Sequence, residues 1–156
     1  MRVVPLPPNP DLEKMLSGLV MRELKVKPAE GLPPDPVAIG LYRTEEPVQE
    51  VALLVELPLA ASLAAALSVV PPGAVKDAVA AQGLEPSLQQ NLAEVMNVLA
   101  RFVSMSGRRF GLAATWFPPG ELDPKVLAAA RESDETRVVA VEVPGYMPGR
   151  LAFNTL

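Results

Sequence analysis

Eighteen prolines divide this 156-residue chain into short segments and constrain its fold more than any other feature. Proline interrupts helices and is excluded from central strands, so each proline indicates a boundary. Pairs of prolines occur at residues 7–8, 33–34, 71–72 and 118–119. We therefore expect short elements between these pairs. The chain shows neither an internal repeat nor a linker between domains, and its length suits a single domain, residues 1–156.

Hydrophobic spacing between the prolines predicts an α+β fold. Helices are expected at residues 11–25, 59–70, 72–82 and 87–104, and a short one begins at Asp123 with Pro124 at its first position. Strands are expected at 37–43, 48–57, 109–117, 137–143 and 150–154. Hairpin connections favour antiparallel pairing. The predicted fold class is thus a mostly antiparallel sheet with helices packed on one face, and residues 1–36 form an N-terminal helix and a Pro-rich connector.

The stretch Val51–Val70 is long enough to cross a bilayer, but its sequence favours another structure. Glu56 lies near its middle, where a charge costs about 2.5–3.5 kcal/mol in a membrane. Pro58 follows, and no basic residue flanks the stretch. We therefore expect a buried strand that turns at Pro58 into a buried helix, and no membrane partner.

The absence of both His and Cys narrows the chemistry open to this chain. Without Cys there are no disulfides, no thiolate catalysis and no Cys-ligated zinc, which fits a cytoplasmic protein. Without His the commonest general base and metal ligand are missing. A net charge of −4 argues against nucleic acid as a partner. Any reaction must therefore use Asp, Glu, Asn, Ser, Lys, Arg or Tyr.

The segment Ser87–Ser104 carries the candidate site. At 3.6 residues per turn, one face is apolar and comprises Leu88, Leu92, Val95, Leu99 and Phe102. The opposite face carries Gln90, Glu94, Asn97 and Arg101, with Glu94 and Asn97 adjacent because they are three residues apart. On spacing alone, this polar face is typical of any solvated helix. It also sets a carboxylate and a carboxamide together on a rigid element.

Taken together, these segments resemble the CheC/CheX-type chemotaxis phosphatases, a family that includes FliY. Glu94-Val95-Met96-Asn97 matches the family's E-x-x-N pattern on its central helix, and the strand and Ala-rich helix before it resemble the family's strand–helix unit. Pro118 and Pro119 stand near the place of a proline expected after the Asn. The last two strands resemble the closing hairpin, and the likeness spans roughly residues 37–154.

The resemblance implies a phosphatase that acts on the phosphoaspartate of a CheY-like response regulator. Asn97 would position the attacking water, and Glu94 would bind the regulator's active-site Lys. The chain would need no cofactor of its own, because Mg²⁺ would belong to the regulator. Gln90, Arg101, Pro118 and Pro119 would contact the partner. The presence of a single E-x-x-N motif resembles the arrangement in CheX. The resemblance to this family also favours a homodimer.

Two departures from the family pattern keep an alternative open. Gln90 stands where the family often has Asp or Ser, and Arg101 stands in a run that usually contains Gly. Arg101 lies one turn from Asn97, where it obstructs the partner, occupies the amide of Asn97 or contacts the partner's acidic pocket. The alternative is a catalytically inactive CheX-like module that binds a receiver domain or another protein. A homo-oligomeric scaffold without a receiver partner is a third reading.

Overall fold

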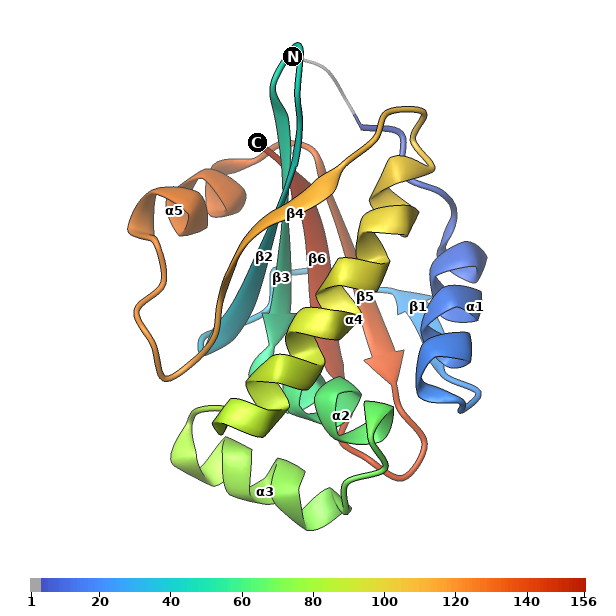
Figure 1. Cartoon of the computed structure of the whole chain (residues 1–156), viewed down its shortest axis with the longest axis vertical. Coiled ribbons are helices and arrows are strands. Elements are labelled where there is room, and N and C mark those ends of the chain that lie inside the picture. The colour runs from blue at the N-terminus through green and yellow to red at the C-terminus, as the bar shows by residue number, and fades with distance from the viewer. Residues whose placement is uncertain (1–3) are drawn as a thin grey trace.

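The computed structural model describes residues 4–156 and is built on one six-stranded sheet (Figure 1). The strands are β1 (Lys25–Pro28), β2 (Val37–Thr44), β3 (Gln49–Glu56), β4 (Gly111–Trp116), β5 (Thr136–Glu142) and β6 (Gly149–Thr155). Their order across the sheet is β1-β5-β6-β3-β2-β4, and every neighbouring pair is antiparallel. β3 and β6 are therefore central, whereas β1 and β4 are the two edges.

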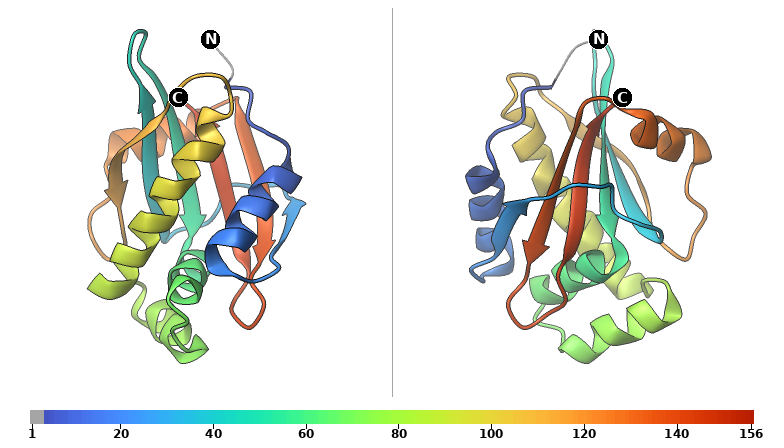
Figure 2. Two further views of the ribbon diagram at one scale, coloured as in Figure 1. Left: turned by 45° about the vertical axis from the view of Figure 1, so that its right-hand side comes forward. Right: turned by 180° about the vertical axis from the view of Figure 1, so that it is seen from behind.

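Helices cover mainly one face of this sheet, which confirms the predicted α+β class. They are α1 (Asn9–Val20), α2 (Leu57–Leu67), α3 (Pro72–Ala81), α4 (Pro86–Ser104) and α5 (Pro124–Glu132). α1, α2 and α4 lie on the same side, with α3 below α2 (Figures 1 and 2). α5 is the exception, because its Ala130 packs with Val37, Ile39 and Leu54 on the opposite face. Alternate residues of β2 and β3 thus enter two different cores, and the central run of each strand, residues 37–42 and 51–55, is wholly buried.

The apolar stretch 51–70 forms a strand and a helix, as predicted. β3 ends at Glu56 and α2 starts at Leu57, so the chain turns next to Pro58. The carboxylate of Glu56 accepts a hydrogen bond of 3.0 Å from the backbone N–H of Arg150. Within residues 4–156, none of the helices combines the length and the apolar character that crossing a bilayer requires.

All five helices contain a proline at one of their first two positions. These prolines are Pro10, Pro58, Pro72, Pro86 and Pro124. Proline fits there because the first N–H groups of a helix have no partner inside it. The prolines therefore fix where the helices begin, as the sequence indicates. Of the helices described in residues 4–156, only α5 adds a side-chain cap, in which Asp123 accepts from the N–H of Lys125.

The end of the first helix was predicted wrongly, and β1 was missed. α1 ends at Val20, not at Lys25, because Met21 adopts a left-handed conformation with φ of 54°. Two side chains of α1 then hold the next segment: the Ser17 hydroxyl accepts from the N–H of Leu24 at 3.0 Å, and Glu13 accepts from that of Val26 at 2.9 Å. β1 lies within residues 1–36, for which only a helix and a connector were predicted. Its formation therefore depends on tertiary contacts.

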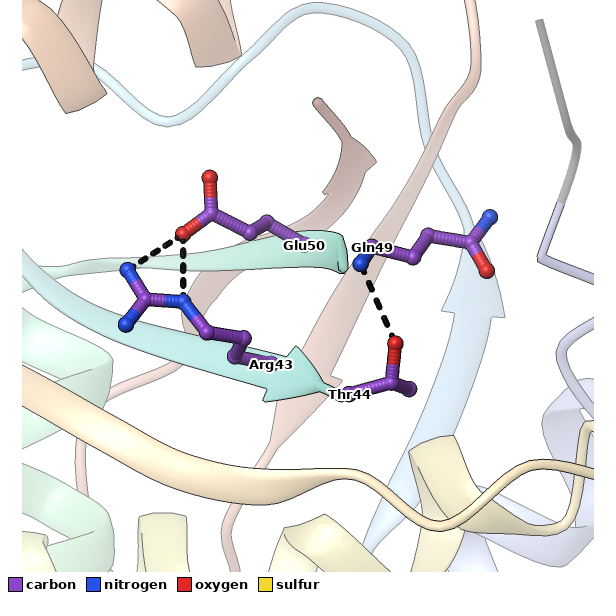
Figure 3. Close-up of polar contacts among 4 residues, drawn as sticks. All are labelled: Arg43, Thr44, Gln49 and Glu50. Carbon is purple, nitrogen blue, oxygen red and sulfur yellow. Dashed lines mark hydrogen bonds and ion pairs between the residues drawn. The ribbon is translucent and has the colours of Figure 1, made fainter. Parts of the chain in front are cut away.

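Side chains also hold the predicted hairpin between β2 and β3 (Figure 3). Arg43 forms an ion pair of 2.7 Å with Glu50 on the facing strand. The Thr44 hydroxyl accepts a hydrogen bond of 3.0 Å from the backbone N–H of Gln49. Arg108, which follows α4, donates at 3.1 Å to the side chain of Gln49. The hairpin is therefore tied to the segment that joins α4 to β4.

Candidate functional site

Helix α4 is firmly held by its apolar face. It crosses the sheet diagonally (Figure 1), and the buried residues are those expected from the sequence, extended by two more. These residues are Leu88, Leu92, Val95, Met96, Leu99, Phe102 and Val103. Asn91 adds a polar contact, because its side-chain amide donates to the carbonyl of Ala64 in α2 and to the hydroxyl of Ser68 just after α2, both at 2.9 Å. The helix therefore provides a rigid platform.

The outer face of α4 carries the four side chains that the sequence singled out. All four are exposed, and successive members are four, three and four residues apart: Gln90, Glu94, Asn97 and Arg101. That spacing forms a continuous stripe along the helix. Within residues 4–156, none of these four side chains forms a hydrogen bond or an ion pair. Arg101 therefore leaves the amide of Asn97 and the carboxylate of Glu94 open to another molecule.

A buried tyrosine supports the helix directly beneath this pair. The Tyr42 hydroxyl, from β2, donates a hydrogen bond of 2.6 Å to the backbone carbonyl of Met96, which lies between Glu94 and Asn97. Tyr42 has no exposed surface, and burial raises the pKa of its phenol, so the group stays a neutral donor. Gly40 makes room for Met96, because a Cβ there would lie 3.0 Å from the methionine sulfur.

Sequence reasoning did not identify Tyr42, since a tyrosine in an apolar strand reads as ordinary core. Its hydroxyl was the only available signal, because a buried hydroxyl needs a partner. Nothing in the sequence identified that partner as a carbonyl in the middle of α4.

Replacing Tyr42 with Phe is expected to lower the free energy of unfolding by about 1–2 kcal/mol, because a buried hydrogen bond is lost. The difference between wild type and variant should shrink as the pH rises above about 10, since the unfolded chain then releases the phenol proton that the folded chain retains. Urea titrations at pH 7 and pH 10.5 measure both effects. A difference independent of pH would contradict a buried neutral phenol.

The two prolines expected near the site lie at the beginning of α4. Pro118 is buried, and its carbonyl accepts a hydrogen bond of 2.8 Å from the N–H of Leu84. Pro119 is exposed and packs on Gly83, where a Cβ would lie 2.7 Å from the Pro119 Cδ. They therefore adjoin the α3–α4 turn, whereas Glu94 occupies the middle of the helix.

In chemical terms, the stripe offers a free carboxylate, a free carboxamide and a free guanidinium on one rigid surface. An amide both donates and accepts hydrogen bonds, so it can orient a water molecule. A carboxylate binds a cationic group, and a guanidinium binds an anionic one. Across residues 4–156, no three acidic side chains converge in a way that would hold a metal ion.

Comparison with known proteins identifies the fold. No protein-family model matches the chain, and no curated protein matches it by sequence. Among solved structures, a chain of the FliM–SpeE complex from H. pylori matches with a TM-score of 0.64 and 9% identity, over 93% of this chain and 80% of that one. The CheX–CheY–BeF3–Mg²⁺ complex from Borrelia burgdorferi matches with a TM-score of 0.56 and 14% identity, over 94% and 96%.

FliY from Thermotoga maritima matches with a TM-score of 0.52 and 15% identity, over 92% of this chain and 81% of that one. The predicted CheC/CheX/FliY-type fold is therefore confirmed. FliM middle domains share the same architecture.

Proposed function

We propose that this chain hydrolyses the phosphoaspartate of a CheY-like receiver domain. Support comes from one observation above all: Glu94 and Asn97 are exposed, and have no partner among residues 4–156, in the middle of a helix that buried contacts hold in place. The fold adds to this support, because a protein of the same fold has been crystallised with CheY. Neither His nor Cys is needed for such a reaction, and this chain has neither.

In the proposed reaction, water attacks the phosphorus, the bond from phosphorus to the aspartyl oxygen breaks, and inorganic phosphate and the free aspartate result. Asn97 would hold the water in line with that bond through its amide. Phosphoryl transfer gains mainly from positioning and charge stabilisation, so an uncharged positioning group suffices. The Mg²⁺ at the phosphate would belong to the receiver domain.

Glu94 would fix the orientation of the partner by binding its active-site Lys. A carboxylate that pairs with an ammonium group aligns the two surfaces and steers their encounter. Gln90 and Arg101 would extend this contact toward both ends of the stripe. Arg101 would contact an acidic surface of the receiver; its exposure and its lack of an ion pair with any described carboxylate support this role.

The direct test is phosphate release from a phosphorylated receiver domain. Asn97→Ala should lower the rate of release by about 100-fold at saturating protein, because the water is no longer oriented. Glu94→Ala should instead weaken binding of the receiver by about tenfold or more. Glu132→Ala, an exposed carboxylate on α5, serves as the matched control and should change neither. Equal release with wild type, both site variants and buffer alone would refute the proposal.

The alternative is a CheX-like module that binds a receiver or another protein without catalysis. Gln90 and Arg101 favour it as departures from the family pattern, and so does the fold shared with FliM, which has been crystallised with SpeE and with FliG. In that case a pull-down detects the receiver although no phosphate is released, and Arg101→Glu abolishes binding. Light scattering of the chain alone measures whether it is a homodimer.

A further inference from the structure

A groove lies between α3 and the N-terminal end of α4. It has a volume of about 330 Å³ and is open to solvent. Its floor is formed by Ala78, Leu84 and Leu88, and the exposed Pro119 forms a wall. The groove exists because Gly83 has no side chain, which allows Pro119 to pack against the α3–α4 turn. It is distinct from the exposed stripe that begins at Gln90.

The charges around the groove are all of one sign. Among the described residues, the only charged ones that line it are Asp77, from α3, and Glu85, immediately before α4, and both are exposed. No Lys or Arg of residues 4–156 lines the groove. Neither carboxylate forms an ion pair in the described part of the chain. Glu85 accepts one hydrogen bond there, of 2.8 Å from the hydroxyl of Ser87. An apolar floor between two exposed carboxylates that have no cationic partner in the described residues favours a ligand that is both apolar and cationic.

We propose that this groove binds a segment of a partner protein in which an aliphatic side chain adjoins a Lys or Arg. The volume is at the lower end of the range for binding pockets, so it suits one or two side chains and not a large cofactor. The aliphatic side chain lies on Ala78, Leu84 and Leu88, where its burial provides affinity. The basic group lies between Asp77 and Glu85, which provide specificity and exclude acidic segments. This inference does not depend on the proposed phosphatase activity.

The experiment is selection of peptides from a random heptapeptide library displayed on phage, with the full chain immobilised. We expect enriched peptides to contain Leu, Ile, Val or Met next to Lys or Arg. Synthetic copies of them should bind the Asp77→Lys variant about tenfold more weakly than the wild type. Ala81→Trp, which places an indole over the groove from an exposed lining position, should abolish binding.

Two matched variants separate the groove from general effects. Glu132→Lys changes the net charge by the same amount as Asp77→Lys but lies on α5, so it should leave binding unchanged. Ala80→Trp adds the same bulk to α3 at an exposed position outside the groove and should also bind normally. Circular dichroism verifies that each variant is folded.

The proposal fails if no peptide is enriched, if the enriched peptides are acidic, or if they bind Asp77→Lys and Ala81→Trp as tightly as the wild type. It also fails if Ala81→Trp alone converts a dimer into a monomer, because the groove then holds a second copy of this chain. Phosphate release from a receiver domain is measured on the same variants. Unchanged release would show that the groove and the Glu94–Asn97 site act separately.

Discussion

A Phe102→Ala variant is expected to have a free energy of unfolding about 3–5 kcal/mol lower than the wild type. Phe102 is fully buried in the last turns of α4, and its ring lies 5.3 Å, centroid to centroid, from that of Phe153 in the central strand β6. Truncation removes the buried area and leaves a cavity, because neighbouring side chains collapse only partly. The loss is large compared with the roughly 5–15 kcal/mol that stabilises a typical domain.

Urea denaturation followed by circular dichroism measures this effect. Arg101→Ala is the matched control, because it truncates the preceding residue of the same helix on its exposed side. Surface changes of that kind alter stability by roughly 0.5 kcal/mol or less. A loss below about 1 kcal/mol for Phe102→Ala would contradict the packing of α4 on β6.

Replacement of Gly149 by Val is expected to lower the free energy of unfolding by about 1–3 kcal/mol or more, through overpacking. Gly149 begins β6, and a Cβ there would lie 2.8 Å from the Leu59 Cβ and 3.2 Å from the Leu59 backbone nitrogen. The backbone of α2 cannot move away without disturbing the strand–helix junction. The glycine is therefore required for close approach, not for an unusual φ angle.

A second glycine provides a control of opposite sign. Gly18 lies inside α1, and a Cβ there would meet nothing within 4 Å. Gly18→Ala should therefore stabilise the protein by about 0.5–1 kcal/mol, because alanine loses less backbone freedom than glycine on entering a helix. Thermal unfolding of both variants gives the comparison. A destabilised Gly18→Ala together with a normal Gly149→Val would contradict the arrangement of α1, α2 and β6.

The features predicted well from the sequence are those with local causes. The buried stripe of α4 follows from helical periodicity, and Leu88 through Phe102 occupy the expected face. The helix starts follow from proline, whose effect on the backbone does not depend on distant residues. The exposure of Glu94 and Asn97 follows from the same periodicity, because a helix whose apolar face packs on the sheet leaves the opposite face for polar groups.

Features that depend on contacts between distant segments were not predicted. β1 is a four-residue strand at the sheet edge. Glu13 of α1 accepts from the N–H of Val26 in this strand, and Ser17 accepts from the N–H of Leu24 just before it. The support of Met96 by Tyr42 joins residues 54 positions apart. The apolar groove depends on the meeting of Gly83 and Pro119. The sequence shows each of these residues, but not which of them will be neighbours.

The proline at the start of α4 has a consequence for how this protein can vary. Pro86 prevents α4 from extending at its N-terminus. An insertion or deletion between Pro86 and Glu94 therefore cannot be compensated by a shift of the helix start. It would instead rotate everything beyond it by about 100° around the helix axis. Glu94 and Asn97 would then turn away from the solvent-exposed face, and buried leucines of α4 would become exposed. Insertions and deletions in this interval are therefore constrained far more than substitutions on the outer face.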